Sequence, residues 1–261
     1  MASSKNVPFL QGANLVAFLT TVVVNALSNV LPMNGKTVGE ISDLYPNLFT
    51  PAAYVFSIWG IIYAFLFAFA IYQALPQNRE KIFLHRISGL FVLSSIANIV
   101  WIFLWLYEQI VLSVIPMVIL LVALIAIYLR LQIGQSKVPL KEKLCVQLPF
   151  STYLGWITVA TISNVAAALT AINWDGWGIG ETTWTLLMII VALIVTIAVV
   201  SMRKDVAFSL VIIWALGGII VKQIENQSIV LTASAGAIII AVALIVRMIL
   251  SRSGQSHSTI A

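Results

Sequence analysis

Tryptophans, tyrosines and asparagines recur at helical spacing inside the apolar runs of this sequence. Two stripes each lie on one face of a helix: Ser94, Asn98, Trp101 and Trp105 form the first, and Tyr153, Trp156, Ala160, Ser163 and Ala167 form the second. Asn164 lies at the edge of the second stripe, and Trp59 and Tyr63 are one turn apart on another run. Aromatic rings stack on flat ligands, and indole N–H groups and amides hydrogen-bond their edges, so these residue types could form a binding pocket.

Helix packing explains the same residues without a ligand. Tryptophans gather where a bilayer meets water, and asparagine or serine side chains hydrogen-bond between neighbouring helices. Asn25 and Asn29, one turn apart on the first apolar run, fit either interpretation. The residue types alone therefore leave a pocket and simple packing open as alternatives.

Catalytic and metal-binding groups are missing from these apolar runs. Neither His85 nor His257 lies in one, and no acidic residue lies in the middle of one. Cys145 is the only cysteine, which excludes an intramolecular disulfide and a cysteine-rich metal site. We therefore predict no catalytic residue, no metal site and no cofactor, and we do not expect an enzyme.

The composition predicts a membrane protein. Of the 261 residues, 61% are hydrophobic and only 9% are charged, whereas soluble domains carry about 25% charged residues. Membrane lipid, rather than a protein core, must cover so much apolar surface. The net charge of +5 does not indicate a nucleic-acid partner, because the basic residues lie in short loops between apolar runs.

The fold class expected is an all-α, polytopic transmembrane helix bundle with about eight spans. A span needs roughly 20 apolar residues to cross the bilayer. The first run is longer than the apolar part of a signal peptide, so we interpret it as a retained helix. The expected spans are Asn14–Leu31, Ala52–Leu75, Ile87–Tyr107, Val111–Ile133, Leu144–Ile172, Thr182–Met202, the shorter Val206–Val221, and Ile229–Leu250.

The charges of the loops predict the orientation. With eight spans, 12 of the 14 lysines and arginines fall on the side that holds both termini, and only Lys36 and Lys222 fall on the other. Lysine and arginine in short loops favour the cytoplasmic side. We therefore expect a protein of the cell membrane with its N- and C-termini in the cytoplasm.

Three motifs resemble the TspO/MBR family, which comprises the tryptophan-rich sensory proteins and the mitochondrial translocator protein. The stretch 50–63 resembles the signature that opens the family's second helix; the matching residues, in order, are Thr50, Pro51, Val55, Phe56, Trp59 and Tyr63. Tyr54 stands where the family has a tryptophan. Residues 98–101 resemble the third-helix pattern N-x-x-W, and residues 153–164 resemble the fifth-helix pattern Y-x-x-W…N.

The resemblance covers about residues 10–175 and implies a TspO-like five-helix core. We assign residues 1–177 to that core and residues 178–261 to a three-helix transmembrane extension with a short polar tail. The family binds tetrapyrroles such as porphyrins, and sterol-like molecules. The ligand-binding residues that the motifs and stripes suggest are Tyr54, Trp59, Tyr63, Asn98, Trp101, Trp105, Tyr153, Trp156 and Asn164.

The function we infer is that of a membrane sensory protein that binds a hydrophobic or amphipathic small molecule in an aromatic cavity, and the resemblance implies a tetrapyrrole. A transporter or permease for such a molecule is the alternative. The cavity is expected between the first, second, third and fifth spans, open toward the outer leaflet. The loop Pro32–Pro51 is long for a simple linker, and a lid and a passive connector both remain open.

The extension offers no chemistry of its own. Trp214 is interpreted as a packing residue. Ala233, Ala237 and Ala241 form a face of small residues that allows close helix contact. This face either packs the extension onto the core or forms a homodimer, and the sequence does not decide between them.

Overall fold

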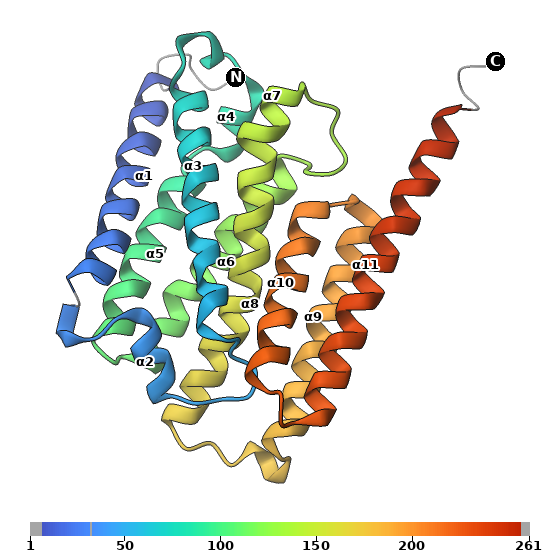
Figure 1. Ribbon diagram of the computed structural model, residues 1–261. Coiled ribbons are helices and arrows are strands. Elements are labelled where there is room, and N and C mark those ends of the chain that lie inside the picture. The colour runs from blue at the N-terminus through green and yellow to red at the C-terminus, as the bar shows by residue number, and fades with distance from the viewer. Residues whose placement is uncertain (1–6, 32, 257–261) are drawn as a thin grey trace.

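Long apolar helices run up and down between the two ends of the molecule (Figure 1). The computed structural model describes residues 7–31 and 33–256, and in these ranges it contains helices and no strand. The long helices are α1 (Val7–Val30), α3 (Ile58–Ala74), α5 (Leu90–Leu106), α6 (Ile110–Arg130), α8 (Leu148–Ala171), α9 (Glu181–Arg203), α10 (Val206–Lys222) and α11 (Gln227–Ser256). Three short helices lie in the connections: α2 (Val38–Leu44), α4 (Ile82–Ile87) and α7 (Leu140–Glu142).

The prediction of an all-α, polytopic membrane bundle is confirmed. Six helical stretches of the described chain are long and apolar enough to cross a membrane, and α5 and α10 are shorter apolar helices of 17 residues each. At 1.5 Å per residue such a helix spans about 25 Å, somewhat less than the hydrocarbon thickness. Local thinning of the bilayer accommodates such a mismatch at small cost.

The third span differs from its predicted bounds. It was expected from Ile87, but the backbone breaks at Ser88, whose φ of 49° ends α4 and separates it from α5. The apolar run continues through this break, so hydropathy alone does not reveal it. The first helix also begins earlier than expected, at Val7 instead of Asn14.

Three of the long helices end in the same way, with a non-glycine residue in the left-handed conformation. These residues are Glu108 after α5, Gln132 after α6 and Asn173 after α8, with φ values of 56°, 53° and 51°. In each case the residue after the left-handed one donates a backbone hydrogen bond to the carbonyl five residues before it. Gln109 N, for example, donates to Leu104 O at 2.8 Å. This closure satisfies carbonyls that a helix end would leave unpaired, and it sets the direction in which the chain leaves the helix.

The bundle has two parts that meet along α10. Helices α1, α3, α5, α6 and α8 pack together, and α9, α10 and α11 pack beside them, with α10 against α8 (Figure 1). The small-residue face of α11 is used inside the chain: Ala233 is fully buried, and Gly236 lies close to Leu216 of α10. Contacts within the chain therefore account for this face, and a homodimer is not required to explain it.

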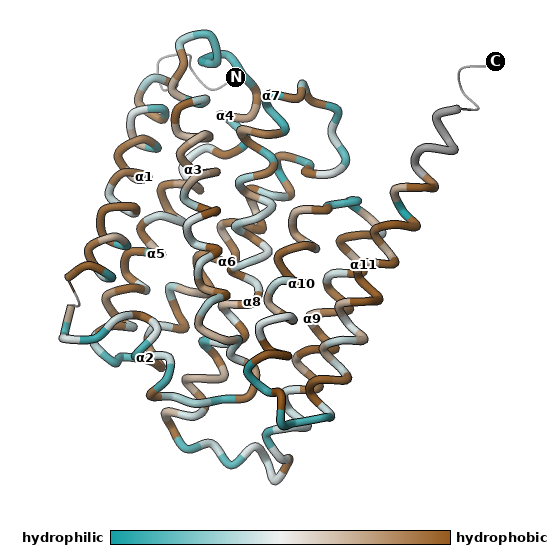
Figure 2. Tube along the Cα trace, viewed as in Figure 1, coloured by the Kyte–Doolittle hydropathy of each residue, from teal (hydrophilic) through white to brown (hydrophobic). Residues whose placement is uncertain are grey.

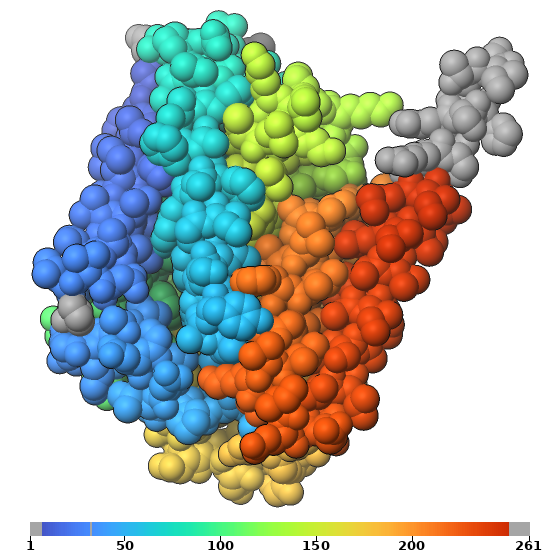
Figure 3. All heavy atoms as spheres, viewed as in Figure 1, coloured from blue at the N-terminus to red at the C-terminus, as the bar shows by residue number. Residues whose placement is uncertain are grey.

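Hydrophobic residues predominate along the length of the bundle, and hydrophilic residues gather at its two ends (Figure 2). Figure 3 shows one face of the molecule with all heavy atoms, coloured by residue number. One end, here called the basic end, holds the start of α1 together with α4, α7 and the α9–α10 turn. Its described basic residues are Arg79, Lys81, Arg86, Arg130, Lys137, Lys141, Lys143, Arg203, Lys204 and Arg247. The opposite end, here called the lid end, holds α2, and its basic residues among those that the structure describes are Lys36 and Lys222.

Gly218 of α10 gives a test of how the two parts meet. Its carbonyl accepts a hydrogen bond from Ala52 N at 3.1 Å, and a Cβ added to it would lie 2.1 Å from Cγ2 of Val55. Gly218→Ala should therefore destabilise the protein by about 1–3 kcal/mol through overpacking. Gly217→Ala is the matched control, because nothing lies within 4 Å of its added Cβ.

The stability of both variants is measured as the melting temperature of the purified protein in detergent. Gly217→Ala should leave the melting temperature unchanged or raise it, since alanine favours a helix by about 1 kcal/mol. Equal melting temperatures for the two variants would contradict the contact between α10 and residues 51–55.

Candidate ligand-binding site

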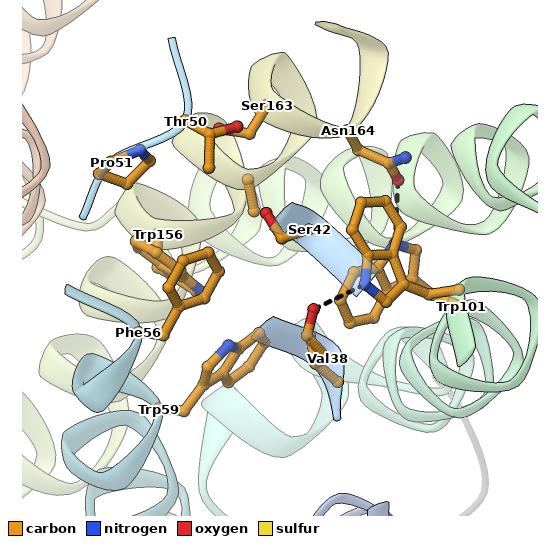
Figure 4. Close-up of a pocket in the computed structure, with 12 residues that line it drawn as sticks. Val38, Ser42, Thr50, Pro51, Phe56, Trp59, Trp101, Trp156, Ser163 and Asn164 are labelled. Atoms are coloured by element: carbon orange, nitrogen blue, oxygen red, sulfur yellow. Dashed lines mark hydrogen bonds between the residues drawn. The ribbon is translucent and has the colours of Figure 1, made fainter. Parts of the chain in front are cut away.

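Four tryptophans from three helices meet around a cavity beneath α2. Trp59 comes from the first turn of α3, Trp101 and Trp105 from α5, and Trp156 from α8. Figure 4 shows Trp156 and Trp59 on one side of the cavity and Trp101 on the other. The complete lining consists of Val38, Ser42, Thr50, Pro51, Phe56, Trp59, Trp101, Trp105, Trp156, Ala160, Ser163 and Asn164.

The rings contact one another in the geometries that aromatic side chains prefer. Trp101 and Trp105 are stacked, with ring centroids 5.6 Å apart. Trp156 meets the edges of Trp59 at 6.2 Å and of Phe56 at 5.6 Å. Offset and edge-to-face pairs contribute about 0.5–1.5 kcal/mol each beyond buried area, so the cavity wall is stable without a ligand.

The amide of Asn164 is already engaged within the protein. Its Oδ1 accepts a hydrogen bond from Trp101 Nε1 at 2.9 Å, and its Nδ2 donates to Ser113 Oγ at 2.8 Å. This bridge joins α5, α8 and α6. Nothing in the sequence pattern pointed to Ser113, which lies in an otherwise apolar run. Asn164 therefore holds the wall in place, and a ligand would have to compete for its amide.

Two other polar groups on the cavity wall have no partner. Trp156 Nε1 and Ser163 Oγ are buried, and neither has a hydrogen-bond partner among the described residues. Trp156 is only 2% exposed. A buried donor without a partner costs about 1–3 kcal/mol, so such groups usually serve a bound molecule or water. Two residues of the lining thus carry an unpartnered polar group: an indole N–H, which can only donate, and a hydroxyl, which can donate or accept.

Five of the nine residues proposed from the sequence line the cavity: Trp59, Trp101, Trp105, Trp156 and Asn164. Tyr63 lies behind Trp59, stacked on it at 5.5 Å. Tyr54 is not part of the lining; 46% of its surface is exposed, and its ring packs edge-on against Trp214 at 5.3 Å. A shared motif therefore does not place every one of its residues in the same cavity.

Asn98 and Tyr153 also lie outside the lining, where they join helices. Asn98 Oδ1 accepts from Asn25 Nδ2 of α1 at 2.9 Å, and Asn98 Nδ2 donates to the hydroxyl of Tyr153 at 3.3 Å. Asn29 is exposed and donates to the Asn25 carbonyl of its own helix. The expectation that the first span lines the cavity is not met, because α2 takes that place.

The loop between the first two spans covers the cavity and is attached to the end of α5. Trp105 Nε1 donates to Val38 O at 3.0 Å, and Asn34 Nδ2 donates to Leu106 O at 3.1 Å. Lys36 and Glu108 form an ion pair at 2.7 Å, worth about 0–1 kcal/mol because both are partly exposed. With α2 in place, the volume open to water-sized molecules is about 30 Å³, which accommodates a water or two.

A capping box holds α2 helical. Thr37 accepts from Glu40 N, and the Glu40 carboxylate accepts from Thr37 N at 2.7 Å. These hydrogen bonds with the backbone and hydroxyl of Thr37 hold the pKa of Glu40 below its ordinary value. The cap therefore stabilises α2 at pH values above the ordinary carboxyl pKa, and this contribution is lost as the pH falls through the lowered pKa.

Helix α10 supports the segment that precedes α3. Trp214 Nε1 donates to Val55 O at 3.1 Å, 159 residues away in sequence. Trp214 is a packing residue, as expected, but it packs against the turn Ala53–Ser57 that carries Phe56 into the cavity. The extension is thus part of the structure that positions the site.

The fold and the cavity define a polytopic helical membrane protein with an aromatic pocket at one end. A family profile described as TSPO-like protein matches residues 11–246. The chain belongs to this family, and the match includes α9, α10 and most of α11 as well as the five-helix part. The resemblance inferred from the three motifs is confirmed, and membership supports a membrane protein of the sensory or ligand-binding kind. No curated protein and no solved structure matches the chain.

The hydrogen bond between Trp105 and Val38 gives a test of the cover. Trp105→Phe removes the donor, and the loss of about 1 kcal/mol should speed amide hydrogen exchange in residues 38–44 about fivefold. Trp177→Phe is the matched control, because Trp177 is 76% exposed at the same end of the molecule. Equal exchange rates in the two variants would show that Trp105 does not hold α2.

Proposed function

We propose that this protein binds a flat, largely apolar small molecule of the tetrapyrrole or sterol-like class in the cavity lined by the four tryptophans. The observation that carries the proposal is the indole N–H of Trp156, buried in an aromatic wall without a partner. A ring system with an acceptor on its edge satisfies that donor while its faces contact the surrounding indoles. The family to which the chain belongs supports the same class of ligand.

Binding of such a molecule requires α2 to move. The present volume is far below the several hundred cubic ångströms of a pocket that encloses a drug-sized ligand. Val38 and Ser42 of α2 occupy the space between the walls in Figure 4. The cover is held by polar contacts with the end of α5 and by the buried side chains of Ile41 and Phe49, and it lies outside the long helices, so it can open while the bundle stays intact. We therefore propose that the loop is a lid.

A receptor accounts for the cavity better than a permease. Binding sites of secondary transporters lie near the middle of the bilayer, between repeated halves. This cavity lies near the lid end, since its lining includes Trp105, the second-last residue of α5, and Trp59, the second residue of α3. A sensory role that couples occupancy to the position of α2 follows from this placement.

We propose binding at this site and no reaction. The described residues contain no group of three or more histidine, cysteine or acidic side chains that could hold a metal ion. The wall offers hydrogen bonds and ring contacts, which bind and orient a ligand.

Ser163→Ala tests the site with little change to the protein. The hydroxyl has no partner among the described residues, so its removal should leave the melting temperature unchanged. Affinity for protoporphyrin IX, measured by quenching of tryptophan fluorescence, should fall about fivefold if the hydroxyl bonds the ligand. Trp156→Phe should weaken binding further, and Trp177→Phe, which changes an exposed residue outside the lining, should leave the affinity unchanged. Equal affinities in all three variants would refute this site.

The orientation is proposed from the charges at the two ends. The basic end should face the cytoplasm, as the predominance of lysine and arginine there favours. On a Cys145→Ser background, Gly39→Cys should react with a membrane-impermeant maleimide added outside, and Pro139→Cys only after permeabilisation. Position 39 tolerates a side chain, because nothing lies within 4 Å of an added Cβ. The reverse labelling pattern would overturn the orientation.

A further inference from the structure

A second and larger cavity lies at the basic end, far from the tryptophans. It opens between α4, the loop after α6 and the start of α8, and its volume open to water-sized molecules is about 210 Å³. Apolar side chains such as Phe83 and Val146 form its inner wall, and polar groups line the rest. Its size and mixed lining suit a small polar group attached to an apolar remainder.

Three charged side chains line this cavity, and none of them is paired. Arg86 comes from α4, Lys137 from the loop after α6, and Glu142 from α7. None of the three makes a hydrogen bond or ion pair through its side chain with a residue of the described chain. Arg86 is half-buried, so its guanidinium has lost part of its water without gaining a partner. The sum of the three formal charges is +1, which matches a group that carries one negative charge.

The walls of the cavity are fixed in place by contacts on both sides of the loop. Gln147 Nε2 donates to Ser136 Oγ at 2.8 Å, which ties the loop to the start of α8. On its other side the loop presses on the end of α9, where a Cβ added to Gly134 would lie 1.8 Å from Arg203 O. The chain segment Lys143–Gln147 forms a π-helical turn, a feature that often accompanies functional sites. A cavity held in this way needs little ordering when a ligand binds.

We propose that this cavity binds a singly charged phosphate group, with Arg86 as its main ligand and Lys137 beside it. Guanidinium is the side chain best suited to phosphate, because its fork of N–H groups meets two oxygens at once. Glu142 opposes the anion, which favours a phosphodiester over a doubly charged phosphate. The cavity lies where the polar end of the bundle meets the headgroups of a bilayer, so the headgroup of an anionic lipid is the source that fits the apolar wall.

The experiment measures dissociation constants of the full chain in detergent by native mass spectrometry. Dioleoyl phosphatidylglycerol is one probe, and inorganic phosphate is added in a second arm as a competitor. Arg86→Gln should weaken phosphatidylglycerol binding about tenfold, since it removes a charged hydrogen-bond donor. Glu142→Gln should strengthen it about threefold, because a like charge is lost.

Two exposed basic residues outside the cavity lining give the controls. Arg79→Gln and Lys141→Gln remove the same charge from the same end of the molecule and should leave the affinity unchanged. If inorganic phosphate competes in a manner that depends on Arg86, the site stands and its ligand is a soluble phosphate. Equal weakening by Arg79→Gln and Arg86→Gln would show a diffuse surface effect and overturn the site. If Arg86→Gln folds poorly, Glu142→Gln decides, because unchanged or weaker binding in that variant also overturns it.

Discussion

A polar group inside a lipid-covered bundle must find its hydrogen-bond partner within the protein, because the hydrocarbon around it offers none. Many hydroxyls in this structure donate to a carbonyl three or four residues earlier on their own helix, and other polar side chains form short bridges between helices. Asn25, Asn98 and Tyr153 join α1, α5 and α8, while Trp101, Asn164 and Ser113 join α5, α8 and α6. These bridges give the five-helix part its register. Among the buried polar atoms of the described residues that remain unpartnered, Trp156 Nε1 and Ser163 Oγ belong to two residues that line one aromatic cavity.

The same constraint explains why the cavity is closed by a segment outside the spans. Without α2, the indoles at the lid end would be exposed to water, and Trp105 Nε1 would lose its partner within the protein. Helix α2 satisfies both needs, because Val38 accepts from Trp105 and packs on the rings. Its attachment combines the buried side chain of Ile41 with hydrogen bonds and one partly exposed ion pair, and each of these polar contacts is worth about 1 kcal/mol or less. A ligand that replaces these contacts can therefore displace the cover without disturbing the packed helices.

The sequence pattern, through apolar run length, tryptophan spacing and the three family motifs, was enough to predict the fold class and to include the four cavity tryptophans among the expected site residues. It could not predict the break at Ser88, because the apolar run continues through a position where only the backbone changes. Nor could it separate Asn164, which lines the cavity, from Asn98, which does not. Both lie on tryptophan-bearing helix faces, and only the crossing of neighbouring helices decides which amide meets a cavity. Ser113 was missed for the same reason, as its role exists only through Asn164.

The three-helix extension appeared to be separate from the site, because its sequence holds no polar pattern. The extension contributes through the close packing of α10 against the segment that precedes α3. Gly218 has no side chain, so α10 approaches Pro51 and Val55 closely enough for its carbonyl to accept from Ala52 N. Trp214 lies one turn earlier on α10, and its Nε1 donates a hydrogen bond to Val55 O. The turn Ala53–Ser57 is thereby fixed from outside, and with it Phe56, which packs edge-on against Trp156. The position of the cavity wall thus depends on helices that contribute no residue to its lining.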